Sequence, residues 1–166
     1  MTKYSELQER LLRYRHAERQ YQERLIGEVS HFRSDLIRYL EIESIEFQNI
    51  ETNTSGIVFF RDLCDGTLKE RGPSEFIKDG ANQGRQESLL FAVNISILDL
   101  DDSSYNISKD FKCSLHKKSE SFYVTLINGD NYSDILCQRR NNEVDFTPVF
   151  DEIFNRLMES IDPTIF

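Results

Sequence analysis

The chain is poor in the residue types that form disulfide frameworks and structural metal sites. Its 166 residues include no tryptophan, three prolines, three histidines and three cysteines. Cys64, Cys113 and Cys137 are far apart in the sequence and show no paired spacing. This pattern argues against a disulfide-bonded or zinc-binding domain, and it is typical of proteins from a reducing compartment.

Long apolar runs are missing as well. None approaches the ~20 residues that a membrane-spanning helix needs. The N-terminal residues MTKYSELQERLL lack the apolar core of a signal peptide. We therefore expect a cytoplasmic protein that makes no contact with a membrane.

The usual cofactor and metal motifs are also absent. The seven glycines match neither G-x-G-x-x-G nor the spacing of a phosphate-binding loop. His16, His31 and His116 have no partner at the H-E-x-x-H spacing of zinc enzymes. We therefore expect surface histidines, and neither a metal ion nor a cofactor.

Apolar and acidic residues are abundant. Hydrophobic residues make up 39% of the chain, with 12 phenylalanines and 7 tyrosines, which is enough for one globular domain over residues 1–166. The formal net charge of −9 is uneven, because residues 1–42 carry +1 and residues 43–166 carry −10. An acidic surface repels phosphate backbones, so direct nucleic-acid binding is disfavoured and a partner with a basic surface is favoured.

The first 42 residues predict one long amphipathic helix. Apolar residues recur from Leu7 to Leu40 at spacings of three, four or seven, which places them on one stripe. Ser5 and Gln8 have the spacing of a capping box at the start of this helix. Gly27 is where we expect a bend.

A straight helix of this length would be longer than its own domain. Some 37 residues would extend roughly 55 Å, whereas a compact chain of this size is about 40 Å across. Either the helix folds back near Gly27, or its first turns contact another molecule. In the second case we expect the oligomer-forming or docking surface to consist of Leu7, Leu11, Tyr14 and Tyr21.

The rest of the sequence alternates between strand patterns and turns. Residues 43–61 predict a hairpin, residues 62–87 an irregular loop, and residues 88–138 an antiparallel meander with strands at 88–100, 111–116, 122–127 and 132–138. Thr147-Pro148 opens a C-terminal helix over residues 146–161. The fold class is therefore α+β: a long N-terminal helix, an antiparallel sheet of five to six strands, and a C-terminal helix packed on the sheet, with both helices on one face.

These features favour a non-enzymatic, acidic protein-interaction module. Such a module would bind and mask another protein with a basic surface, as inhibitors, immunity proteins and chaperones do. The expected partner-binding residues lie in the acidic turn after the first meander strand and in the irregular loop: Asp99, Asp101, Asp102, Asp65, Glu70 and Glu75. One alternative is a homo-oligomeric scaffold subunit, such as a homodimer, that assembles through the N-terminal helix.

A second alternative is a metal-dependent nuclease. Asp99 ends one predicted strand, and Asp110-Phe111-Lys112 opens the next. This arrangement resembles the D…(D/E)-x-K pattern, in which two carboxylates hold Mg²⁺ and the lysine orients the attacking water. The acidic surroundings of these residues would repel a phosphate substrate, which disfavours a nuclease function.

Overall fold

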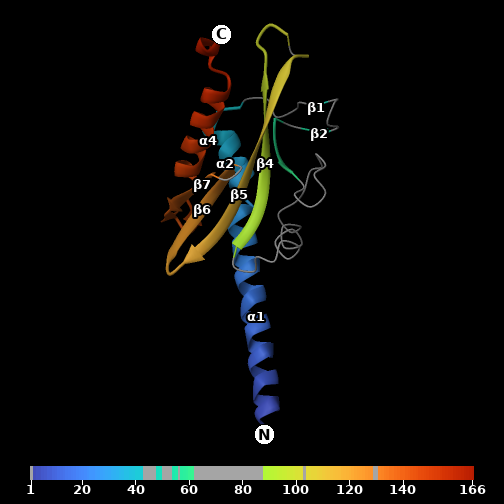
Figure 1. Cartoon of the computed structure of the whole chain (residues 1–166), viewed down its shortest axis with the longest axis vertical. Coiled ribbons are helices and arrows are strands. Elements are labelled where there is room, and N and C mark those ends of the chain that lie inside the picture. The colour runs from blue at the N-terminus through green and yellow to red at the C-terminus, as the bar shows by residue number, and fades with distance from the viewer. Residues whose placement is uncertain are drawn as a thin grey trace.

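The computed structural model describes residues 2–42, 48–49, 54–55, 57–61, 88–102, 104–128 and 131–166. It has the predicted α+β fold, with a long N-terminal helix, a five-stranded antiparallel sheet and a C-terminal helix on that sheet (Figure 1). The elements are, in chain order, α1 (Lys3–Val29), α2 (Phe32–Tyr39), β1 (Gln48–Asn49), β2 (Thr54–Ser55), β3 (Val58–Arg61), β4 (Ser88–Leu98), β5 (Asn106–Lys118), β6 (Ser121–Asn128), β7 (Asn131–Cys137), β8 (Arg139–Arg140), β9 (Glu143–Val144), α4 (Thr147–Ser160) and a 3-10 turn (Pro163–Ile165).

The main sheet has the strand order β3-β4-β5-β6-β7. Its last four strands form the predicted meander, and the longest ladder joins β4 to β5, from Ser88 opposite His116 to Leu98 opposite Asn106. β4 is central and is buried on both faces over most of its length, as its nearly continuous apolar sequence predicts. The strands of this meander therefore form most of the sheet on which the helices pack.

The predicted hairpin over residues 43–61 is wrong in its pairing. β1 pairs with β2, whereas β3 pairs with β4, with Val58 opposite Ile95. The apolar residues of β3 explain the difference, because Val58, Phe59 and Phe60 are all buried. They bury more apolar surface beside the central strand than they would in an isolated hairpin.

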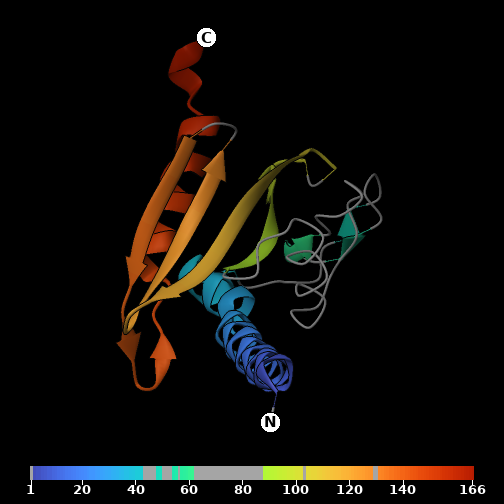
Figure 2. The ribbon, with the colours of Figure 1, turned by 60° about the horizontal axis from the view of Figure 1, so that its bottom comes forward.

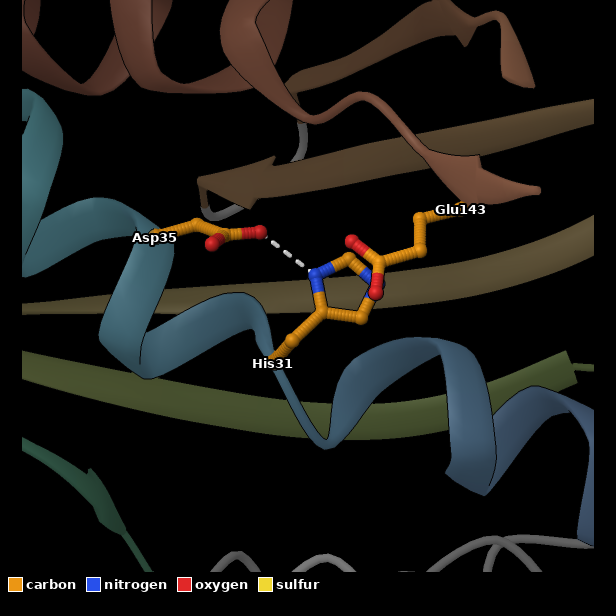
Figure 3. Close-up of side chains that lie close together, drawn as sticks. All are labelled: His31, Asp35 and Glu143. Carbon is orange, nitrogen blue, oxygen red and sulfur yellow. Dashed lines mark hydrogen bonds and ion pairs between the residues drawn. The ribbon is translucent and has the colours of Figure 1, made fainter. Parts of the chain in front are cut away.

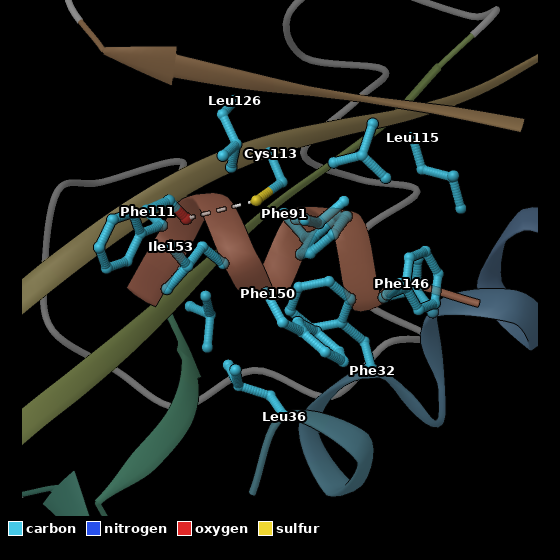
Figure 4. Close-up of a cluster of buried hydrophobic side chains, with 14 of the residues drawn as sticks. Phe32, Leu36, Phe91, Phe111, Cys113, Leu115, Leu126, Phe146, Phe150 and Ile153 are labelled. Carbon is cyan, nitrogen blue, oxygen red and sulfur yellow. Dashed lines mark hydrogen bonds between the residues drawn. The ribbon is translucent and has the colours of Figure 1, made fainter. Parts of the chain in front are cut away.

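Helices α1, α2 and α4 pack on the same face of the sheet, as predicted. Phe32 of α2 lies at the centre of this layer (Figure 4). Its ring centroid is 5.1 Å from that of Phe91 of β4, 5.0 Å from that of Phe146, and 5.1 Å from that of Phe150 of α4. Rings at these distances and steep angles have the edge-to-face geometry that aromatic pairs favour, so this cluster ties both helices to the sheet.

The predicted single helix over residues 1–42 is two helices. α1 ends at Val29 and α2 begins at Phe32, so the break lies at Ser30 and His31 rather than at Gly27. Ser30 Oγ donates to the carbonyl of Gly27 at 2.6 Å, which closes the last turn of α1. The start also differs, because the N-cap is Thr2, whose Oγ1 accepts the backbone N–H of Ser5 at 3.1 Å.

The sequence did not suggest the small hairpin of β8 and β9. Its connection, Asn141-Asn142, has positive φ angles of 52° and 65°, which are the angles of a type I′ hairpin turn and which asparagine tolerates well. The hairpin pairs Arg139 with Val144 and Arg140 with Glu143. It leads directly into α4 and carries Glu143 towards the start of α2.

The buried stripe of the C-terminal helix contains fewer residues than the spacing of its apolar residues indicates. Val149, Phe150, Ile153 and Leu157 are buried. The helical spacing of the apolar residues predicts that Phe154 and Ile161 belong to the same stripe, but these two side chains are 42% and 38% exposed. Leu157 lies further along the helix than Phe154 and is buried, so Phe154 is exposed because of the face of α4 on which it lies. Figure 2 shows this helix running along one face of the sheet.

Candidate functional site

The N-terminal two thirds of α1 stands away from the sheet (Figure 1 and Figure 2). We call residues 3–20 the projecting segment and residues 21–29 the packed segment. In the projecting segment every side chain is exposed except those of Ser5 and Glu18, which are half-buried. Leu7 is 64% exposed, and Leu11 and Tyr14 are each 58% exposed. The predicted overhang of this helix is therefore present.

Tyr21 differs from the other three residues of the predicted docking surface. It is half-buried against the core, and its hydroxyl accepts the backbone N–H of Lys117 at 3.0 Å. Tyr21 therefore holds α1 to the sheet of its own chain. Leu7, Leu11 and Tyr14 remain as the exposed part of that surface.

The exposed residues continue the line of the buried ones. Starting from Leu25 at the core, the positions alternate in steps of four and three residues towards the N-terminus, and we call them the α1 stripe: Leu25, Tyr21, Glu18, Tyr14, Leu11, Leu7 and Tyr4. Alternation of this kind is the a/d pattern of a coiled-coil seam. One such stripe therefore packs on the sheet at one end and faces solvent at the other.

The positions that flank the α1 stripe are basic or neutral. These are the e and g positions of the heptad, where a partner helix would contact the charged side chains. They contain no acidic residue: Lys3, Gln8, Arg10, Arg15, Ala17, Gln22 and Arg24. The acidic residues Glu6, Glu9 and Glu23 point away from the stripe, and Glu18 lies within it.

The predicted acidic turn lies at the connection between β4 and β5. Asp99, Asp101 and Asp102 are exposed. Asp99 Oδ1 accepts the backbone N–H groups of Asp101 and Asp102 at 2.8 and 2.9 Å. Hydrogen bonds from Ser104 lower the pKa of Asp102. Two of the three carboxylates thus stabilise the turn itself, and their part in partner binding remains a prediction, as it does for Asp65, Glu70 and Glu75, which lie outside the described residues.

The residues of the nuclease pattern are not brought together. Asp110 lies opposite Asn94, whose Nδ2 donates to Asp110 Oδ1 at 2.8 Å. Asp99 follows Asn94 by five residues along the same strand direction, which corresponds to about 17 Å. Asp99 is therefore too far from Asp110 to share a metal ion with it.

A cluster that the sequence did not predict lies where α2 begins. His31 Nδ1 is 2.5 Å from Asp35 Oδ2, one turn further along the helix (Figure 3). Glu143 reaches the same place from β9. One ring nitrogen of His31 and one carboxylate oxygen each of Asp35 and Glu143 lie within 4.8 Å of one another. The His31 side chain is 18% exposed and that of Asp35 is 26% exposed.

Glu28 lies on the other side of the His31 ring. It is buried, its Oε2 accepts the backbone N–H of Val144 at 3.2 Å, and its Oε1 pairs with Arg139 at 3.2 Å. Its Oε2 is 3.9 Å from His31 Nε2. Spacings of three and four residues from Glu28 to His31 to Asp35 would place all three on one face of a continuous helix, and they remain neighbours across the break between α1 and α2. That spacing was the only signal of this cluster in the sequence.

A pocket of about 340 Å³ adjoins the cluster. It lies between α2, the β8–β9 hairpin and the start of α4, and Asp35, Arg38, Tyr39, Arg140, Glu143 and Asp145 supply its polar lining. Arg38 pairs with Asp35 at 3.2 Å, and Arg140 pairs with Asp145 at 3.2 Å. A hydrogen bond from the Thr147 hydroxyl lowers the pKa of Asp145. The hydrogen bond that Tyr39 donates to Asp151 raises the pKa of Tyr39.

The described cysteines offer no reactive thiolate. Cys113 and Cys137 are both buried, and neither forms a disulfide bond. Burial raises the pKa of Cys137 to about 12 and the pKa of Cys113 still further above its ordinary value. Both thiols are therefore protonated at neutral pH, and they act as small apolar core residues.

Comparisons with protein-family models, with curated proteins and with solved structures found no match for this chain. Among the described helices, none combines the length and the apolar character needed to cross a membrane. The functional interpretation therefore depends on the geometry of two features, the exposed part of the α1 stripe and the cluster around His31.

Proposed function

We propose that this protein is a non-enzymatic protein-interaction module whose projecting segment docks with an amphipathic helix of another protein. The observation that carries the proposal is the α1 stripe, which is buried at Leu25 and exposed at Leu11 and Leu7. Contiguous apolar surface on a soluble domain marks interaction sites. Covering one such leucine contributes roughly 1.5–3 kcal/mol to binding before the cost of ordering is subtracted.

The charges beside the stripe indicate the chemistry of the partner. Lys3, Arg10 and Arg15 occupy flanking positions of the projecting segment, and none of its flanking positions holds an acidic residue. A partner helix with glutamate or aspartate beside its own apolar stripe would pair with them. Glu18 lies within the stripe, so the partner would place a lysine, arginine or other polar residue at that layer, which would fix the register of the two helices.

The same charges disfavour pairing of two copies of this helix. In a parallel pair, Arg10 would face Arg15 of the second copy, and the two Glu18 carboxylates would meet in one layer. In an antiparallel pair, like flanks face each other, and neither flank contains an acidic residue. The basic flanks therefore favour a different, acidic protein over a homodimer.

The acidic turn between β4 and β5 is a second candidate surface, and it suits a basic partner. The exposed turn with Asp99, Asp101 and Asp102 belongs to the acidic body of the chain. It would attract a basic surface and speed the encounter, as expected for a module that masks another protein. The projecting segment is the stronger candidate, because it adds apolar area to charge.

Designed helical peptides test this proposal. The probe has leucine at a and d, glutamate at e and g, and a lysine in the layer of Glu18, and a second probe carries lysine at e and g. We expect the acidic-flanked peptide to bind the full chain at least ten times more tightly than the basic-flanked peptide. Calorimetry at several salt concentrations measures this ratio, which should fall as salt screens the flanking charges.

Paired variants locate the binding surface. Leu11→Glu with Tyr14→Glu should abolish binding of the acidic-flanked peptide. His16→Glu with Gln20→Glu adds the same charge on the opposite face of α1, where both residues are exposed, and should leave most of the binding intact. Equal effects of the two pairs, or no binding of either peptide, would contradict the proposal. A dimer in light scattering that only the first pair dissociates would instead support the homo-oligomeric scaffold.

A further inference from the structure

Both nitrogens of the His31 ring face a carboxylate. Nδ1 is 2.5 Å from Asp35 Oδ2, and Nε2 is 3.9 Å from Glu28 Oε2. A neutral imidazole has one N–H donor and one bare acceptor nitrogen. Whichever nitrogen is bare therefore points a lone pair at a carboxylate oxygen. A cation between the two groups removes this repulsion, and it can be a second proton or a metal ion.

The two sides of the ring differ in what they can hold. Nε2 is buried and has no hydrogen-bond partner among the described residues. The carboxylate that it faces, Glu28, already binds the N–H of Val144 and the guanidinium of Arg139. The Nδ1 side faces Asp35, which lines the pocket together with Glu143. In the metal-free chain the hydrogen bond of the ring is the one between Nδ1 and Asp35. An ion on the Nδ1 side would displace that proton and leave the ring proton on Nε2, which faces Glu28 at 3.9 Å.

We propose that His31, Asp35 and Glu143 bind one divalent transition-metal ion, with Zn²⁺ as the best fit. His31 would contribute Nδ1, and the two acidic residues one oxygen each. Bonds of about 2.0–2.2 Å in tetrahedral geometry place ligand atoms roughly 3.4 Å apart. One ring nitrogen of His31 and one oxygen each of Asp35 and Glu143 already lie within 4.8 Å of one another. Nδ1 and Asp35 Oδ2 are 2.5 Å apart, so side-chain rotation would have to separate these two atoms to form the site. The adjoining pocket supplies room for water at the fourth position.

The surroundings of the site match a bound cation. Near the ring, Glu28, Asp35 and Glu143 contribute three negative charges, against the two positive charges of Arg38 and Arg139. A ligating histidine usually gives its second N–H to a carboxylate, and the carboxylate on the Nε2 side of this ring is Glu28, at 3.9 Å. One imidazole with two carboxylates suits zinc and its neighbours, whereas calcium needs six or more oxygen ligands.

The ion would join two parts of the fold that are distant in sequence. His31 and Asp35 belong to the α2 region, and Glu143 lies on β9 beside the type I′ turn. Binding would fix the β8–β9 hairpin against α2 and stabilise the folded state by an amount that grows with the logarithm of the free ion concentration. The three ligands, His31, Asp35 and Glu143, lie outside the projecting segment, so the site is independent of the docking surface.

Titration of the metal-free full chain with Zn²⁺ tests the site. Calorimetry should give one equivalent of tight binding, and thermal unfolding should shift upward with added Zn²⁺. Glu143→Gln removes an exposed ligand without disturbing the core, and it should weaken binding by tenfold or more. Glu120→Gln is the matched control, because Glu120 is exposed at the β5–β6 turn and should bind as the unchanged chain does.

Nitrogen-15 spectra of the histidine rings identify the ligand atom. We expect Zn²⁺ to shift the Nδ1 resonance of His31 and to leave a proton on Nε2. Lack of binding, equal affinity in the Glu143→Gln and Glu120→Gln chains, or a His31 ring that carries two protons and does not respond to Zn²⁺ would each overturn the proposal. Loss of binding in Asp35→Asn as well as in Glu143→Gln would support the complete ligand set.

Discussion

The two segments of α1 have the same pattern and opposite surroundings. In the packed segment, Leu25 is fully buried by the sheet, whereas in the projecting segment Leu11, two heptads earlier on the same stripe, is 58% exposed. Helical periodicity states which face is apolar, but it does not state what covers that face. The sheet ends beside Tyr21, and the helix continues. The difference between the segments therefore comes from the size of the sheet and not from the helix sequence.

Truncating one leucine in each segment to alanine should give the largest difference in the free energy of unfolding. Leu25→Ala should lower the free energy of unfolding by about 3 kcal/mol, since it leaves a cavity in the core. Leu11→Ala should change it by no more than ~0.5 kcal/mol, because the side chain is exposed in the free chain. Urea unfolding followed by circular dichroism, at low protein concentration, measures both. A similar cost at the two positions would mean that the projecting segment is covered in solution.

The comparison also separates what sequence reasoning can and cannot reach. The overhang at Leu7, Leu11 and Tyr14 was predictable, because it needs only a helix length and a domain size. The meander was predictable for a similar reason, since alternation and turns are local signals. The pairing of β3 with β4 was not, because the choice between two possible neighbours for Val58 depends on the total apolar area that each arrangement buries.

The cluster around His31 shows the same limit at a single site. The spacing from Glu28 to His31 to Asp35 is visible in the sequence and would place the three residues on one face of a continuous helix. Glu143 could not be added to them, because its position depends on the Asn141-Asn142 turn and on how the β8–β9 hairpin meets α2. The Thr2 cap was missed for a simpler reason, since Thr2 and Ser5 are both acceptable N-cap residues.

Breaking a charge pair should also lower the free energy of unfolding more in the packed segment than in the projecting segment. The difference should be smaller than for the two leucines. Glu28→Gln keeps an acceptor for the N–H of Val144 and removes the ion pair with Arg139 at a buried position, so we expect a loss of roughly 1–3 kcal/mol in the free energy of unfolding. Glu9 pairs with Arg13 at 3.6 Å, with both side chains mostly exposed, so Glu9→Gln should have no measurable effect. Chemical denaturation of the two variants and of the unchanged chain measures both changes in the free energy of unfolding. Equal stabilities would show that the Glu28–Arg139 pair contributes nothing to holding the packed segment.

Glycine and alanine exchanges should give the smallest difference in stability between the two segments. They also test most directly whether the two segments unfold independently. Gly27 lies in the packed segment, and a Cβ added there meets nothing within 4 Å, so Gly27→Ala should raise the free energy of unfolding by roughly 0.5–1 kcal/mol through reduced freedom of the unfolded chain. Ala17→Gly is the reverse change at an exposed position of the projecting segment. It should speed amide hydrogen exchange in residues 3–20 and leave the global unfolding midpoint unchanged, because that segment can fray without disturbing the core. A lowered midpoint for Ala17→Gly would mean that both segments unfold as one cooperative unit. In that case the projecting segment would be a rigid extension of the domain before any partner binds.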